Sequence, residues 1–459
     1  MNLIQEEINK LLDLFNQGLF GEVLRKSGHL IKEFPAEKFI VKLQGVCHME
    51  LNEFSLAEKK FKEFVVLDEN DPEIFNNLGI LFHRQFQYQK SLTNFRKAIS
   101  LDKNYFNAFN NLGSLFRDFG LFNEAIKTYK DGLVINQQNV ELHQNLSHCL
   151  LITGQFEEGS QEYNWRWPIS QIIEKNSLLN SKKMWDGKNT NVRLLLWREQ
   201  GLGDEIFFLN FLRNLRKKIK KIKVIIDRRL KTIYENSFPE ITFYTEQKNI
   251  LKDDFDFHLP IGNLIATLHH YQDFLNYKSF PYLFSDQNKV NSLKAELPKE
   301  KKIIGIAWKT LNEAGEIDSK SIDISIFGEL FKDKNCIIVP LQYGDVESDL
   351  EALRNIFGLE ILEFPSICRW SDIDGLAALI DVCDLVISSS NSIVHLAGAL
   401  RKPTKVFLPL VPSFWWLDEG KKTAWYDSVQ LYRQKELESW SEPYYDMKSD
   451  IENFFDTGV

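Results

Sequence analysis

The sequence predicts an α-helical repeat array followed by an α/β region of two halves, each built on a parallel sheet. Two observations support this fold class. The first third of the chain is similar to itself at a spacing of 34 residues, which is typical of stacked helix pairs. Beyond residue 190, apolar strand-like segments alternate with helix-like segments, which indicates parallel sheets covered by helices. A chain of 459 residues is long enough for two or three domains.

The repeat is defined by small and aromatic residues that recur in register. Three positions stand out: Gly45, Gly79, Gly113 and Ser147, then Ala57, Ser91, Ala125 and Gly159, then Phe61, Phe95, Tyr129 and Tyr163. We expect the small residues where two helices touch, and the aromatic rings where the neighbouring repeat packs. The pattern resembles the tetratricopeptide repeat, which implies about five repeats over residues 1–167 and a superhelix with a concave face.

Asparagines on the first helices of the repeats are candidates for binding an extended acceptor peptide in that concave face. They are Asn76, Asn77, Asn110, Asn111 and Asn145. An asparagine amide both donates and accepts hydrogen bonds, so it can bind a peptide backbone whatever its sequence. The alternative is that these side chains are solvated helix surface.

The rest of the chain divides into four segments. Residues 168–190 form a polar linker, residues 191–298 a first α/β half and residues 299–435 a second. We expect the final segment, 436–459, to form a helix that packs back on the first half. Strands are predicted at 192–197, 223–227, 241–244, 255–259, 303–308, 336–341, 359–364, 384–388 and 404–408, and helices at 205–215, 324–331, 375–382 and 392–400. A cleft between the halves is the natural place for a ligand.

A Gly-x-Gly-Asp turn follows the first of these strands. Gly201 and Gly203 allow a sharp turn and a close backbone approach, and we expect them to give an acceptor room. Asp204 stands where a base meets a substrate, although an acid near a helix start is also a common helix cap. A dinucleotide fingerprint is excluded because Ile206 occupies the place of its third small residue.

The second half carries a hydroxyl-rich turn suited to phosphate. Ser389, Ser390, Asn391 and Ser392 lie between a strand and a helix that carries His395. Lys309, Lys320 and Ser321 follow the first strand of this half, where a cation would stabilise a departing diphosphate, and Gln342 borders a possible base pocket. The alternative for His395 is a buried histidine whose hydrogen bonds are made within the protein. Lys320 could instead face solvent, and Gln342 could pack in the core or a loop.

Several motifs in order resemble the tetratricopeptide-repeat glycosyltransferases, whose catalytic part is similar to ADP-heptose:lipopolysaccharide heptosyltransferases. They are Trp185-Asp-Gly187, 195–206, Gly305-Ile-Ala-Trp308, 341–345 and 386–403. With the repeat array, the chain also resembles bacterial flagellin glycosyltransferases. The resemblance implies a GT-B fold of two Rossmann-like halves and a metal-independent, inverting transfer from a nucleotide sugar.

Residue by residue, the resemblance makes Asp204 the general base. It matches Lys309 or Lys320 to the basic segment near the donor phosphates. The segment that holds the donor corresponds to Ser390, Asn391, Ser392 and His395. The sequence departs from the family at Ser390, which stands where the family has an aspartate, and this puts donor preference and activity in doubt.

Composition limits the partners and the compartment. The formal net charge of −8 argues against nucleic acid, and no apolar run approaches the length of a membrane span. Five scattered cysteines indicate neither a disulfide framework nor a zinc site, and we expect a cytoplasmic protein without metal or other cofactor. Repeat arrays often self-associate, so a homo-oligomer is one open expectation.

The sequence therefore predicts a glycosyltransferase that moves a sugar from a nucleotide sugar to a protein acceptor such as flagellin, recruited by the repeat groove. One alternative keeps the chemistry but makes the acceptor a lipopolysaccharide or other glycan. The other is a non-catalytic scaffold with a degenerate transferase domain, and Ser390 is its main support.

Overall fold

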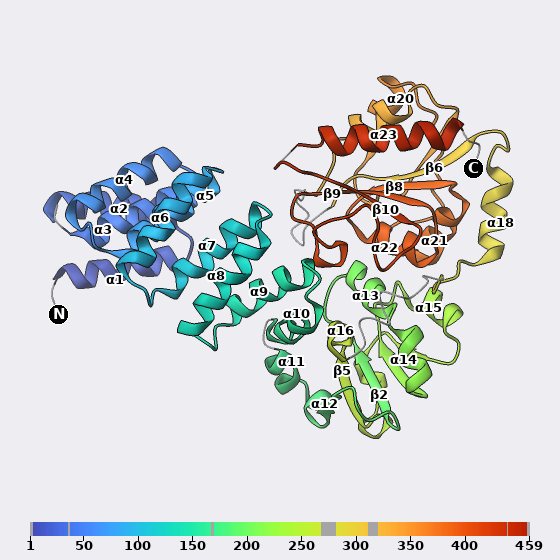
Figure 1. The fold of residues 1–459 in the computed structure, drawn as a ribbon, viewed down its shortest axis with the longest axis horizontal. Coiled ribbons are helices and arrows are strands. Elements are labelled where there is room, and N and C mark those ends of the chain that lie inside the picture. The colour runs from blue at the N-terminus through green and yellow to red at the C-terminus, as the bar shows by residue number, and fades with distance from the viewer. Residues whose placement is uncertain are drawn as a thin grey trace. The chain divides into compact units, whose positions relative to one another are not determined.

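The computed structural model describes residues 3–34, 37–166, 169–267, 281–310, 320–437 and 439–456. The chain forms two compact units, Met1–Cys149 and Leu150–Val459, and each is considered by itself (Figure 1). The first unit is helical, and the second contains two parallel sheets. The predicted fold class, a helical repeat followed by an α/β region with two parallel sheets, is confirmed.

Pairs of helices build the first unit. They are α1 (Leu3–Asn16), α2 (Phe20–Glu33), α3 (Lys38–Glu50), α4 (Phe54–Leu67), α5 (Pro72–Arg84), α6 (Tyr88–Leu101), α7 (Phe106–Asp118), α8 (Phe122–Ile135) and the start of α9 (Val140–Ile152). Local sequence explains their starts: Asp71, for example, caps α5 by accepting the Glu73 N–H at 2.8 Å, and Pro72 follows at the first helical position.

The turn between the helices of each pair contains one residue in the left-handed region, repeated every 34 positions. Gly18 and Gly120 have φ of 74°, while Asn52 has 58° and Phe86 has 56°. Glycine adopts this conformation freely and asparagine tolerates it, whereas phenylalanine is strained in it. The turn geometry is therefore kept even where the residue is unfavourable.

The recurring small and aromatic residues pack within one helix pair. A Cβ on Gly45, Gly79 or Gly113 would lie 2.3–2.5 Å from the ring of Phe61, Phe95 or Tyr129, each on the second helix of the same pair. These rings therefore pack within their own pair, and Phe61 also belongs to a core that contains Ile74 and Leu78 of the next pair, as expected for a ring that contacts the neighbouring repeat. The glycines are required because the rings fill the space that a side chain would occupy.

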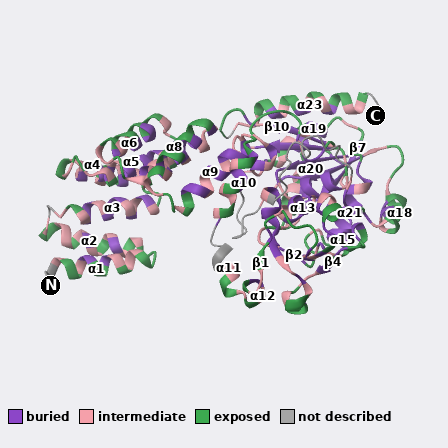
Figure 2. Cartoon of the chain, turned by 60° about the horizontal axis from the view of Figure 1, so that its bottom comes forward, coloured by how far each residue is buried: buried purple, intermediate pink, exposed green. Residues whose placement is uncertain are grey.

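The second unit contains two five-stranded sheets with the strand orders β1-β5-β2-β3-β4 and β10-β9-β8-β6-β7, parallel throughout. The strands are β1 (Lys183–Met184), β2 (Arg193–Trp197), β3 (Lys221–Ile225), β4 (Thr242–Tyr244), β5 (Phe257–Pro260), β6 (Lys302–Ala307), β7 (Cys336–Pro340), β8 (Leu385–Ser389), β9 (Thr404–Leu408) and β10 (Val429–Arg433). Buried residues are concentrated in these sheets and in the helix faces that cover them (Figure 2).

Around the sheets lie α10 (Phe156–Glu162), η1 (Tyr163–Trp165), α11 (Ile169–Lys175), α12 (Ser177–Asn180), α13 (Leu202–Leu209), α14 (Leu212–Lys218), α15 (Lys231–Ser237), η2 (Gln247–Asn249), η3 (Lys252–Asp254), η4 (Ile261–Asn263), α16 (Leu264–Thr267), α18 (Gln287–Glu296), α19 (Ile324–Phe331), α20 (Glu347–Asn355), α21 (Ile373–Val382), α22 (Ser392–Ala399), η5 (Phe414–Trp416) and α23 (Ser441–Asp456).

Three local expectations differ from the structure. The helix predicted over 205–215 is two helices, α13 and α14, and the segment 359–364 makes one parallel bridge, Ile338 to Ile361, instead of a strand. The polar segment 168–190 is more than a linker, because it contains α11, α12 and the edge strand β1. A two-residue edge strand has no apolar run, so periodicity cannot reveal it.

The C-terminal helix α23 packs on the second half, and the expectation that it returns to the first half is wrong. Met447 and Ile451 are fully buried in the core that contains Phe331 and Tyr432. Asp450 accepts a hydrogen bond of 2.6 Å from the Gln430 amide and also contacts the Tyr432 hydroxyl. Apolar burial and this polar network together attach α23 to β10.

Candidate functional site

The loops that carry the predicted site residues leave the carboxyl ends of parallel strands. Asp204 follows β2, Lys309 follows β6, Gln342 follows β7 and Ser390 follows β8. Ligands of α/β folds bind at this edge of the sheet. Helices α13 and α22 contact each other, so the first and second halves meet beside these loops.

Gly203 lies where α13 packs closely on α22. A Cβ there would lie 3.3 Å from the Ser392 Cα and 3.4 Å from the His395 Cδ2. Gly203 therefore lets the two halves pack, which corrects the expectation that it leaves room for an acceptor. Gly201 is exposed and forms the N-cap of α13.

Asp204 combines a cap role with the electrostatics of a base. Its Oδ2 accepts the Gly201 N–H at 3.1 Å, and the side chain is half-buried. Burial raises the pKa of this carboxyl to about 6, while the Gly201 hydrogen bond and the charge of Lys320 oppose the rise. A carboxylate with a pKa close to neutral pH is suited to general-base chemistry.

A buried ion pair holds the loop that leads to Asp204. The Arg166 side chain is 5% exposed and that of Glu199 is 0% exposed, and the guanidinium contacts both carboxylate oxygens. The same carboxylate accepts the Gly262 N–H at 2.9 Å, and Arg166 stacks over the Tyr163 ring at 4.2 Å. Sequence reasoning missed this pair, although Glu199 lies inside the glycine-rich motif.

The hydroxyl-rich turn after β8 uses most of its groups internally. Asn391 caps α22 by accepting the Ile393 N–H at 3.0 Å, and its amide donates to the Ser389 hydroxyl at 3.2 Å and to the Lys309 carbonyl at 3.5 Å. Ser390 is buried and accepts a hydrogen bond of 2.8 Å from the Trp416 indole. Ser392 is half-buried at the helix start.

The other predicted donor residues have structural contacts of their own. Gln342 is buried and accepts the N–H groups of Trp308 at 3.0 Å and Lys309 at 2.8 Å, so it fixes the end of β6. The Lys309 ammonium pairs with Asp349. Ser321 accepts the Thr310 N–H at 2.9 Å.

His395 lies inside an aromatic cluster that seals the contact between the halves. It is 3% exposed, stacks on Trp416 with ring centroids 5.2 Å apart, and bonds the Tyr426 hydroxyl at 3.1 Å. Burial lowers the pKa of this imidazole to about 3, so the ring is neutral. Phe207 of the first half packs on Trp415 at 5.1 Å. The packed alternative describes His395 better than direct donor contact does.

A charged network that sequence reasoning missed lies at the ends of β2 and β3. Arg198 pairs with the buried Glu205 and with Asp227, which also pairs with Arg229 at 2.9 Å. Burial raises the pKa of Glu205 to about 7. The Arg229 guanidinium lies 4.5 Å from the ring centroid of Trp370, a residue of the second half. Two arginines therefore stand at the same sheet edge as Asp204.

In the first unit, the predicted asparagines join successive repeats. The Asn111 amide donates to the Asn76 carbonyl at 2.8 Å, and the Asn145 amide donates to the Asn110 carbonyl at 3.0 Å. Asn77 is also buried. These side chains are not simply solvated helix surface, because they form a ladder that links the first helices of neighbouring pairs.

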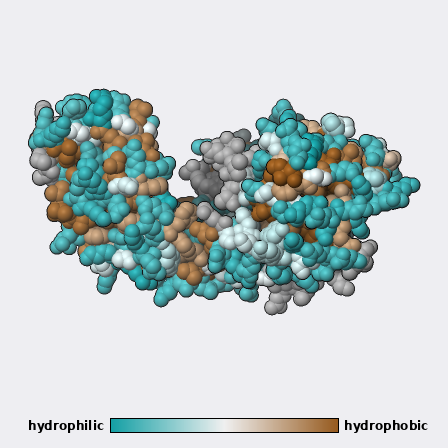
Figure 3. Space-filling model, turned by 90° about the horizontal axis from the view of Figure 1, so that it is seen from above, coloured by the Kyte–Doolittle hydropathy of each residue, from teal (hydrophilic) through white to brown (hydrophobic). Residues whose placement is uncertain are grey.

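The part of the chain that the structure describes lacks both a metal-ligand cluster and a membrane span. No three His, Cys, Asp or Glu side chains gather there as metal ligands. Within the same residues, every helix is too short or too polar to span a bilayer. Hydrophilic residues dominate the visible face of both units, interspersed with smaller hydrophobic patches (Figure 3).

Comparisons with known proteins identify the repeat. A family model described as tetratricopeptide repeat matches residues 72–105, which include α5 and α6. Protein FlbA of Caulobacter vibrioides is 27% identical over 279 residues, covering 56% of this chain and 46% of FlbA. The chain thus spans about half the length of this curated relative. The matched share of this chain is larger than the first unit alone.

Solved structures with similar folds include the MamA protein, at 20% identity over 38% of this chain and 94% of that one, with a TM-score of 0.32. PilW, a type IV pilus biogenesis factor, shows 17% identity over 39% and 83%, with a TM-score of 0.34. A thermophilic tetratricopeptide-repeat protein of Thermus thermophilus is 16% identical over 38% of this chain and 91% of its own, with a TM-score of 0.32. The family match establishes that the chain contains a tetratricopeptide repeat.

Proposed function

We propose that the protein transfers a sugar from a nucleotide-sugar donor to a hydroxyl of a polypeptide acceptor, as a GT-B glycosyltransferase without a metal. The acceptor oxygen attacks the anomeric carbon from the face opposite the leaving group. Asp204 takes the hydroxyl proton, the new oxygen–carbon bond forms, and the bond from that carbon to the diphosphate oxygen breaks. The products are an inverted glycoside and a nucleoside diphosphate.

The observation that carries the proposal is the environment of Asp204. It lies at the carboxyl end of β2, on a helix that contacts α22 of the second half, and its carboxyl pKa is raised to about 6. Burial produces this raised pKa, and the value lies in the range in which a carboxylate can accept a proton at neutral pH. Lys320 interacts electrostatically with this carboxylate, and the cations Arg198 and Arg229 stand at the same edge, where a diphosphate needs compensation.

The repeat array supports a protein acceptor. Tetratricopeptide repeats bind protein partners through extended surfaces, and the asparagine ladder fixes the first helices of successive repeats relative to one another. Resemblance makes flagellin the first acceptor to test. None of the five cysteines forms a disulfide, and we propose that the reaction takes place in the reducing cytoplasm, where the acceptor is synthesised.

One observation favours the scaffold alternative. The Ser390 hydroxyl is occupied by the Trp416 indole, and the amide of Asn391 is bonded within its own turn. A donor must therefore bind through backbone N–H groups, Ser392 and the cations. If it cannot, the α/β unit binds a partner without catalysis.

The test uses the full chain, a panel of UDP-, GDP-, ADP- and dTDP-sugars, and purified flagellin, with the intact mass of flagellin as readout. We expect an added mass of one sugar with one donor. The Asp204→Asn variant should lose it, while Asp323→Asn, a change of the α19 cap acid, should retain it. Transfer with none of the donors would refute the enzyme proposal and leave the scaffold.

A further inference from the structure

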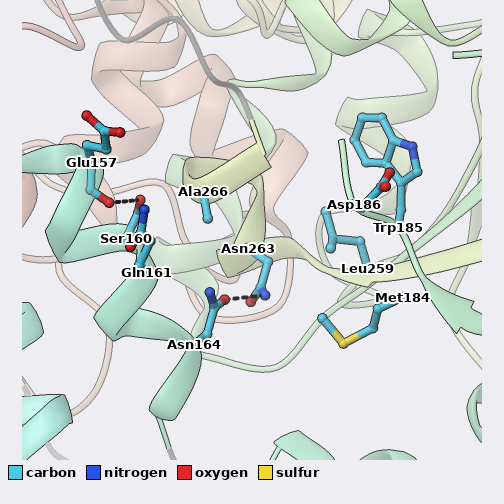
Figure 4. Close-up of a pocket in the computed structure, with 10 residues that line it drawn as sticks. All are labelled: Glu157, Ser160, Gln161, Asn164, Met184, Trp185, Asp186, Leu259, Asn263 and Ala266. Atoms are coloured by element: carbon cyan, nitrogen blue, oxygen red, sulfur yellow. Dashed lines mark hydrogen bonds between the residues drawn. The ribbon is translucent and has the colours of Figure 1, made fainter. Parts of the chain in front are cut away.

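A pocket of about 380 Å³, lined by both polar and apolar side chains, opens at the carboxyl edge of the first sheet (Figure 4). One wall is α10 and η1, which contribute Glu157, Gln161 and Asn164. The other wall follows β1 and β5 and contributes Asp186 and Asn263. All of these residues belong to the second unit.

The pocket shares a sheet edge with Asp204. Strand β5 pairs with β1 on one side and with β2 on the other, and all three are parallel. Adjacent strands lie about 4.8 Å apart, so the pocket is roughly 5–10 Å across the sheet from the end of β2. An extended peptide covers the distance to the end of β2, where the loop to Asp204 begins, with about two or three residues at about 3.3 Å each.

The pocket is connected to the loop that leads to Asp204 by two hydrogen bonds of the buried Asn263 side chain. The Asn263 amide donates to the Asn164 carbonyl at 2.6 Å, and the Asn263 carbonyl accepts from Arg166 at 2.6 Å. Arg166 in turn holds Glu199, five residues before Asp204. The wall of the pocket is therefore held in place before any ligand binds.

The chemistry of the lining selects the ligand. Glu157 and Asp186 are carboxylates, and the Gln161 and Asn164 side chains are amides that can pair with peptide groups. The buried Asn263 amide is already bonded to Asn164 and Arg166, so it supports the wall of the pocket. Among the ten described residues of the lining there is no lysine or arginine, so an anionic ligand such as the donor diphosphate finds no cation there. A cationic side chain on a polypeptide finds both charge and hydrogen-bond partners.

We infer that this pocket, named the flank pocket, binds a lysine or arginine located two or three residues from the hydroxyl that is modified. The inference rests on the proposed function and adds the acceptor specificity. The flank pocket is lined by Glu157, Ser160, Gln161, Asn164, Met184, Trp185, Asp186, Leu259, Asn263 and Ala266. Its apolar residues can pack against the aliphatic part of a lysine or arginine side chain. The acceptor then enters the site between α10 and the first sheet.

Binding of labelled peptides tests the inference without a donor. The probes are two fluorescein-labelled heptapeptides of alanine with a central serine, one with lysine and one with glutamate two positions after the serine. Fluorescence anisotropy with the full chain should show at least tenfold tighter binding of the lysine peptide. The double variant Glu157→Lys with Asp186→Lys should abolish that preference, because it reverses the charge of the lining.

A matched control separates the pocket from the overall charge. Glu174→Lys changes an exposed acid on α11, outside the flank pocket, and should keep the preference. Ala266→Phe keeps the charge but fills the pocket, so it should weaken the lysine peptide about tenfold. This steric variant carries the test if the double variant does not fold, as judged by circular dichroism.

The outcomes distinguish the two proposals. If wild-type protein binds neither peptide or prefers glutamate, or if Ala266→Phe leaves binding of the lysine peptide unchanged, the flank pocket is not an acceptor site. If the peptides bind as expected but no donor supports transfer, the glycosyltransferase proposal fails while the pocket stands as a peptide site.

Discussion

Replacing Asp204 by asparagine should stabilise the protein at alkaline pH while greatly lowering its activity. The carboxyl pKa is raised from 3.8 to about 6 by burial, so the ionised form is unfavourable in the folded state. Each tenfold change in proton affinity corresponds to about 1.4 kcal/mol, which gives a cost of about 3 kcal/mol above pH 6. Asparagine carries no charge and still accepts the Gly201 N–H, so it removes this cost.

The raised pKa also determines how the effect of Asp204 on the free energy of unfolding changes with pH. The folded protein binds this proton more tightly than the unfolded chain, so the aspartate weakens stability progressively as pH rises from about 4 to about 6. The free energy of unfolding of Asp204→Asn, from urea titrations, should match wild type at pH 4 and exceed it by up to about 3 kcal/mol at pH 8.

The activity of Asp204→Asn should fall, although its stability at pH 8 rises. A general base contributes about 10²–10⁴-fold, so kcat/KM should fall by that factor in Asp204→Asn. In the wild type, kcat/KM should fall tenfold for each pH unit below about 6, and the variant should lack this limb. A variant that is less stable than wild type at pH 8, or that keeps its rate, would show that Asp204 only caps α13.

Asp323→Asn is the matched comparison, because Asp323 also accepts a helix N–H. Hydrogen bonds from Ser325 lower the pKa of Asp323, so its ionised form stabilises the fold above the unfolded pKa and this contribution is lost as pH falls. The variant should therefore be less stable than wild type at pH 7, with unchanged activity.

Three further predictions concern stability. Glu199→Ala leaves the Arg166 guanidinium buried without its carboxylate, and should lower the urea stability of the second unit by about 3–5 kcal/mol; a loss under 1 kcal/mol would contradict a buried pair. Phe86→Gly relieves the strain of a left-handed φ of 56° and should stabilise the first unit by about 1 kcal/mol in thermal unfolding. Gly18→Ala places a side chain at a φ of 74° with open space around it, and should destabilise the first unit by a similar amount in the same measurement. Met447→Ala removes a fully buried side chain of α23 and should cost about 2–5 kcal/mol, seen as faster amide exchange over 441–456; unchanged exchange would mean that the helix is held elsewhere.

Much of the fold was readable because its signals are local. The 34-residue period places a left-handed turn at Gly18 and Gly120, and apolar runs such as Leu194–Leu196 mark central strands that are buried on both faces. The strand β1, with only two exposed residues, has no such signal. The order of strands in each sheet also depends on pairings between distant segments.

For the site, the sequence located the loops but not the partners of their side chains. Asp204, Ser390 and His395 all lie near the contact between the halves, as the motifs indicate. Their surroundings were decided by residues far along the chain: Trp416 occupies the Ser390 hydroxyl and covers the His395 ring. No spacing rule predicts a contact between positions 26 residues apart in different elements.

The sequence by itself determined the helical repeat, the alternation of strands and helices, and the position of Asp204 at a strand end, because these follow from local periodicity and turn chemistry. Only the tertiary structure decided the pKa of Asp204, the pairing of Arg166 with Glu199 and the flank pocket. Burial and hydrogen-bond geometry depend on which segments meet in space, and the chain order alone does not specify those meetings.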